Sequence, residues 1–354
     1  MPAPSNTLLI EGAFSELADE FAQYVDALHK NEGSSLQADI APLLQLLRQQ
    51  EQNDEQPDLK QRDEVLKKLV AAATVLNSAP ERGESDTLHC GFNSLTQTEI
   101  TPAYNLLIHL VHQASDADVF LPRICAYLSK PIATSPQFGP TVAISILSTV
   151  FNTLAPSDSS RYHVLLAIVA VIRQSASAYA FEALKPQLVS QLPSWLAAWE
   201  LDEEEAQRLH LAIADAAQTA GDVELSLSHV IQALQSIPAN EAASKESRDL
   251  AVRAMTTALK LPGVFDFTPL TASGAIQALR SSDGTLFELL EIFTSDTLAA
   301  YEEFVSATPL SSISGGGLAD AGEALQTKMR LLTLASLAAS TPSRSLAYST
   351  IASA

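Results

Sequence analysis

The chain has 354 residues and a formal net charge of −20, from 41 acidic and 21 basic side chains. That length allows about two or three domains with a large core, and a hydrophobic content of 47% is typical of globular proteins. Because so negative a surface repels phosphate groups, a primary role in binding nucleic acid or anionic membranes is not expected.

Cysteine usage and the N-terminal sequence both favour a cytoplasmic protein. Cys90 and Cys125 are too few for a disulfide framework and suggest a reducing compartment. The first residues, MPAPSNTLLIEGAFSELADEF, lack the cationic segment of a signal peptide. The longest apolar run, VLLAIVAVI at 164–172, is too short to span a bilayer. We therefore expect a soluble, cytoplasmic chain.

Almost every periodic segment has the period of an α-helix, and sustained strand-like alternation is nearly absent. Good helix formers fill the segments between breaks rich in Gly, Pro, Ser and Asp. The breaks lie at 31–35, 52–58, 79–86, 155–160, 219–222, 236–240 and 281–284. This spacing predicts an all-α protein, an α-solenoid of stacked antiparallel helix pairs of the HEAT or tetratricopeptide kind, although no repeat consensus is visible.

The N-terminal part, 1–190, is interpreted as a helical-repeat region. His109 and His112 would share a helix face, but without an HExxH pattern we interpret them as surface or core-edge histidines rather than metal ligands. Cys90 and Cys125 form no CxxC motif, so buried or idle thiols are favoured over a nucleophile. The sequence predicts no catalytic residue, cofactor site or metal site.

Residues 191–308 form the predicted helical part of a second domain. It opens with both tryptophans of the chain, Trp195 and Trp199, whose i, i+4 spacing places them on one helix face. We interpret them as a structural plug between helices, with a hot spot facing a partner protein as the alternative.

The helix that follows has clear end signals. Asp202 with Glu205 has the spacing of a capping box, and Gly221 stands where a left-handed residue ends a helix. The acidic run at 202–205 lacks the alternating ligand spacing of a calcium loop, so a helix N-terminus explains it better than a cation site does.

A linker and an amphipathic helix end the sequence. The Gly/Ser-rich stretch 309–325 lacks the GK[ST] ending of a phosphate loop and is predicted to be a flexible linker. The helix Lys328–Ser340 then places four apolar side chains at i, i+3, i+4 and i+7: Leu331, Leu334, Ala335 and Ala338. Such a stripe is expected to pack against another surface.

Four stretches in a fixed order resemble the PCI family, whose members occur in the proteasome lid, the signalosome and eukaryotic translation initiation factor three. They are a W-x-x-x-W helix at Trp195 and Trp199, the segment Arg253–Phe267, the pair Leu290–Phe304, and KMRLLT at Lys328–Thr333. The last stretch resembles the initiation-factor member rather than other PCI subunits. The resemblance covers about 150–340 well and the first 140 residues only loosely.

The resemblance implies a helical-repeat domain followed by a winged helix, of which 326–354 would be the beginning. The chain would then end inside that module, without its recognition-like helix and β-wing. Because PCI subunits associate through their winged helices, the resemblance suggests partner-interface residues in this helix: Lys328, Met329, Arg330 and Leu332.

By the same resemblance the protein is a structural scaffold subunit and not an enzyme. It would support assembly of the 43S pre-initiation complex and mRNA recruitment through protein–protein contacts. Its partners would be the other PCI- and MPN-type subunits of the initiation factor and, indirectly, the small ribosomal subunit, with no direct nucleic-acid or membrane contact. The alternatives are a PCI subunit of the proteasome lid or signalosome, or a free α-solenoid adaptor binding a peptide or trafficking cargo.

Overall fold

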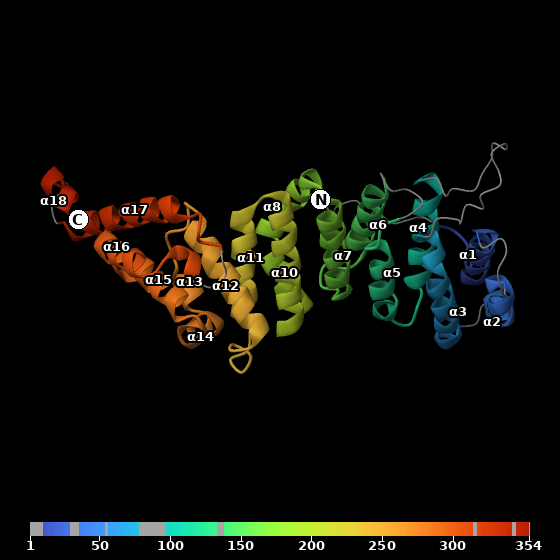
Figure 1. Ribbon diagram of the computed structural model, residues 1–354. Helices are drawn as coiled ribbons and strands as arrows, with labels where there is room; N and C mark the ends of the chain where they lie inside the picture. Colours follow the sequence, from blue (N-terminus) through green and yellow to red (C-terminus); the bar gives the residue numbers. More distant parts are fainter. Residues whose placement is uncertain are drawn as a thin grey trace. The chain divides into compact units, whose positions relative to one another are not determined.

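All regular structure in the described part of the chain is helical, as the sequence predicts (Figure 1). The computed structural model describes residues 10–28, 35–53, 56–77, 97–132, 138–313, 317–341 and 345–353. The chain divides into two compact units, Met1–Leu201 and Asp202–Ala354. Helices adjacent in sequence pack in pairs, among them α1 with α2, α6 with α7 and α10 with α11, which agrees with the predicted α-solenoid.

The first unit contains nine α-helices and two short 3₁₀ helices in its described residues. They are α1 (Phe14–Leu28), α2 (Leu36–Gln52), α3 (Leu59–Ala72), η1 (Ala73–Asn77), α4 (Gln97–Val111), η2 (Ala117–Val119), α5 (Leu121–Leu128), α6 (Gly139–Thr153), α7 (Ser160–Ser175), α8 (Ala178–Ser190) and α9 (Leu192–Trp199). The side chains of Ser35, Asp58 and Ser177 cap the N-termini of α2, α3 and α8. Helix α7 is buried on several sides, which explains its nearly continuous apolar sequence.

The two tryptophans pack together at the end of this unit. Their rings are stacked, with centroids 5.8 Å apart, and Phe151 of α6 contacts both rings edge-on. Trp199 is only 3% exposed, and its indole nitrogen donates a hydrogen bond to the carbonyl oxygen of Pro156 (3.1 Å). Trp195 is half-buried. The pair therefore joins α9 to α6 and to the turn after it.

The second unit also has nine α-helices in its described residues, with one short 3₁₀ helix. They are α10 (Glu203–Ala220), α11 (Val223–Gln235), α12 (Lys245–Lys260), α13 (Thr268–Thr271), α14 (Gly274–Ser282), α15 (Gly284–Ser295), α16 (Leu298–Ala307), η3 (Leu310–Ser312), α17 (Gly322–Ser340) and α18 (Tyr348–Ser353). The capping box of Asp202 and Glu205 is present, and Gly221 adopts the left-handed conformation (φ 89°), as predicted.

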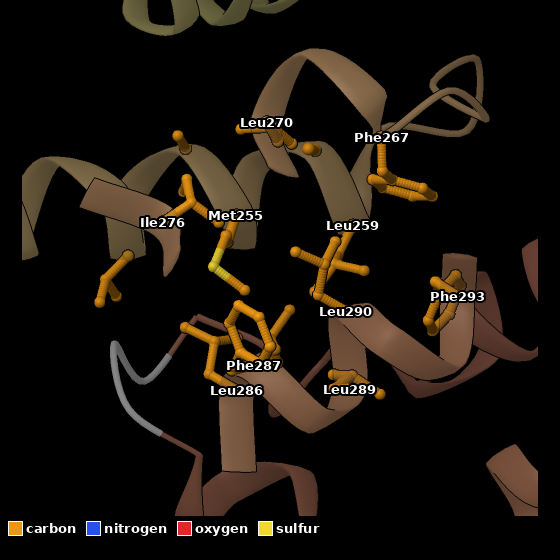
Figure 2. Close-up of a cluster of buried hydrophobic side chains, with 14 of the residues drawn as sticks. Met255, Leu259, Phe267, Leu270, Ile276, Leu286, Phe287, Leu289, Leu290 and Phe293 are labelled. Carbon is orange, nitrogen blue, oxygen red and sulfur yellow. The ribbon is translucent and has the colours of Figure 1, made fainter. Parts of the chain in front are cut away.

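A continuous apolar core joins α12, α14 and α15. Figure 2 shows Met255 and Leu259 of α12 facing Phe287 and Leu290 of α15. Phe293 continues this core with edge-on contacts to the rings of Phe267 and Tyr301. One buried carboxylate, Asp283, is neutralised by two hydrogen bonds from the guanidinium of Arg248 (2.7 and 2.6 Å).

The described residues of the predicted linker 309–325 contribute to the same core. Four of its side chains are buried there: Leu310, Ile313, Leu318 and Ala321. Helix α17 begins at Gly322, inside the stretch assigned to the linker, because these apolar residues pack against the neighbouring helices. Of the three consecutive glycines at 315–317, Gly315 and Gly316 lie outside the described residues. The division of the chain into domains at the predicted boundaries stays a prediction.

Two buried histidines join α10 to α11. The Nδ1 atoms of His210 and His229 are 3.0 Å apart, so one imidazole donates a hydrogen bond to the other. Burial lowers the pKa of both side chains, and for His229, with His210 beside it, to about 4. The pair is therefore neutral in the folded protein near neutral pH.

We expect Trp199→Ala to lower the free energy of unfolding by about 3–5 kcal/mol, because it leaves a large cavity and an unpaired carbonyl. Chemical denaturation followed by circular dichroism measures the change. Tyr179→Ala is the control, since Tyr179 is 88% exposed on α8, and it should change the free energy by less than about 0.5 kcal/mol. A midpoint for Trp199→Ala equal to that of the parent protein would refute a structural role.

We expect the protein to lose stability as the pH falls from 6.5 towards 4. Unfolded histidine binds a proton in this range whereas folded His229 does not, so acid favours the unfolded state. His229 should account for a loss of about 3 kcal/mol, at about 1.4 kcal/mol per pH unit. Denaturation at several pH values should show this slope reduced in His229→Gln and retained in His109→Gln. Parallel slopes for the parent protein and His229→Gln would contradict the assignment.

Candidate functional site

Helix α17 has two faces of different chemistry. One face is buried in the second unit through four side chains: Leu325, Lys328, Met329 and Thr333. The other leaves Leu331 49% exposed and Leu334 40% exposed. The stripe of Leu331, Leu334, Ala335 and Ala338 is therefore not the face that packs within this unit, and its expected packing against another surface stays a prediction. All four lie on the exposed side, because the face of Lys328 and Met329 occupies the contact with α12.

Lys328 joins α17 to the end of α12. Its Nζ donates hydrogen bonds to three backbone carbonyl oxygens, those of Ala258 (2.7 Å), Leu259 (3.3 Å) and Leu261 (2.8 Å). The last carbonyls of a helix have no partner within that helix and carry its partial negative charge. The ammonium group therefore caps α12 from a residue about seventy positions later in the chain.

Two aromatic rings complete the environment of this ammonium group. Its Nζ lies 5.0 Å from the ring centroid of Phe267 and 5.9 Å from that of Phe265. These distances allow cation–π attraction, which partly compensates the loss of water. Burial lowers the pKa of Lys328 from 10.5 to about 8, so the charged form with three donors still predominates at pH 7.

Thr333 gives α17 a second capping contact, this time to the start of α16. Its Oγ1 accepts a hydrogen bond from the backbone N–H of Leu298 (3.0 Å), the first residue of α16. The residue before it, Thr297, makes no side-chain capping bond. Side chains of a single helix, α17, thus provide hydrogen-bond partners for carbonyl groups at the C-terminal end of α12 and for an N–H group at the N-terminal end of α16.

The exposed face of α17 lines a shallow apolar depression of about 480 Å³. Its main apolar side chains come from three helices: Leu298 of α16, Leu331, Leu334 and Leu337 of α17, and Ile351 of α18. Arg330 lies at its edge as the one charged residue of the lining. An apolar surface with a cationic margin is suited to binding another protein surface.

The structure separates the four residues proposed from the sequence as a partner interface. Lys328 and Met329 are buried within the unit, Leu332 is half-buried against its core, and of the four only Arg330 is exposed. Leu331 and Leu334 are not among the interface residues predicted from the sequence, although their helical spacing indicates an apolar stripe. An interface role for the four residues stays a prediction.

Within the described part of the chain, Cys125 and His109 are not assembled with other chemical groups into a reaction centre. Cys125 is buried, which raises the pKa of its thiol to about 12 and keeps it protonated. His109 has its ring nitrogen 3.2 Å from the amide nitrogen of Gln113, one turn away. Among the described residues no three His, Cys, Asp or Glu side chains are placed to hold a metal ion. Cys90 lies outside the described residues.

Comparison with known proteins identifies the family. No protein-family model matches the chain. Eukaryotic translation initiation factor 3 subunit M from Neosartorya fischeri is 75% identical over all 354 residues, which span 72% of that protein. The protein of the same name from Emericella nidulans is 66% identical, and that from Coccidioides immitis is 61% identical, each over the whole chain. The chain belongs to the family of eukaryotic translation initiation factor 3 subunit M.

Membership in the subunit M family confirms the resemblance drawn from the four ordered stretches. It also decides against the proteasome-lid and signalosome alternatives within the PCI class. No helix in the described part of this chain is both long and apolar enough to cross a membrane. The PCI and winged-helix assignments of the C-terminal residues stay predictions from the sequence.

We expect Lys328→Met to lower the free energy of unfolding by about 2–4 kcal/mol. The substitution keeps most of the side-chain volume but leaves three buried or partly buried carbonyls without their donor. Arg330→Met is the matched control, because it removes a cation from the exposed face of the same helix and should cost less than about 0.5 kcal/mol. Thermal or chemical denaturation compares the two variants, and equal effects would show that the capping contact contributes little.

Proposed function

We propose that the chain is a structural subunit of eukaryotic translation initiation factor 3, without turnover of its own. In this role it supports assembly of the 43S pre-initiation complex and recruitment of mRNA by holding neighbouring subunits in place, in the cytoplasm. The names of its relatives support membership in the complex. The all-helical, paired architecture suits a scaffold, because stacked helices present long surfaces for protein contacts.

The observation that carries the proposal is the exposed apolar face of α17. Leu331 and Leu334 lie beside the depression between α16, α17 and α18, while the opposite face of the same helix is fixed by Lys328 and Thr333. A helix held in one orientation loses little conformational freedom when a partner binds its free face. We propose that a neighbouring protein subunit covers this face.

The electrostatics also favour protein partners. The net charge of −20 disfavours direct contact with ribosomal RNA, so the small ribosomal subunit would be reached through other subunits. Arg330 at the edge of the apolar face would meet an acidic group of the neighbour, which would set the register of the contact more than its strength.

The double substitution Leu331→Asp and Leu334→Asp tests the proposal. Both side chains are exposed, so the variant should fold normally, and circular dichroism should show an unchanged melting temperature. Burying two carboxylates against an apolar partner is costly, and we expect recovery of the other subunits with a tagged chain to fall about tenfold or more. Quantitative mass spectrometry of the purified complex measures this recovery.

Leu46→Asp is the matched control, because Leu46 on α2 is 46% exposed and lies in the other unit. It should leave recovery of the initiation-factor subunits unchanged. Equal recovery with the double variant would show that the face of α17 is not the interface. Absence of the other subunits from the purification of the parent chain would refute the scaffold role itself.

A further inference from the structure

We draw no further inference here: the strongest candidate, the apolar groove formed by α6, α7, α8 and α9 in the first unit, carries none because nothing in the structure shows what covers it.

Discussion

The contact between Lys328 and the last carbonyls of α12 is the constraint on which the arrangement of the second unit depends. It places a positive charge at the negative end of a helix and satisfies three acceptors that the helix cannot satisfy itself. With Thr333 bound to the start of α16, it fixes both the position and the rotation of α17. The direction of the free face of this helix follows from those two contacts.

The two faces of α17 differ in what holds them. On the buried side, Lys328 and Thr333 make polar contacts to the ends of neighbouring helices, while the opposite side is apolar and exposed. An exposed apolar face of this kind is suited to contact with the side chains of another protein surface.

Local features of the fold could be predicted from the sequence, because they depend on neighbouring residues. The helical period, the capping box at Asp202 and the left-handed Gly221 belong to this class. The role of Lys328 could not be predicted in this way, since its partners are backbone carbonyls and the sequence does not show which helix end lies nearby. A cation beside an apolar stripe usually indicates a solvent-facing side, and here it lies on the buried side. The apolar depression beside α17 was missed for the same reason, because its lining comes from three separate helices.

The stacked pair Trp195 and Trp199 has a practical consequence for studies of this protein. The chain contains no other tryptophan, and both residues belong to the first unit. Intrinsic tryptophan emission is therefore an optical signal from that unit alone, while the unit containing α17 has no tryptophan of its own. A difference between the emission change and the loss of helical signal during unfolding would show that the two units melt independently.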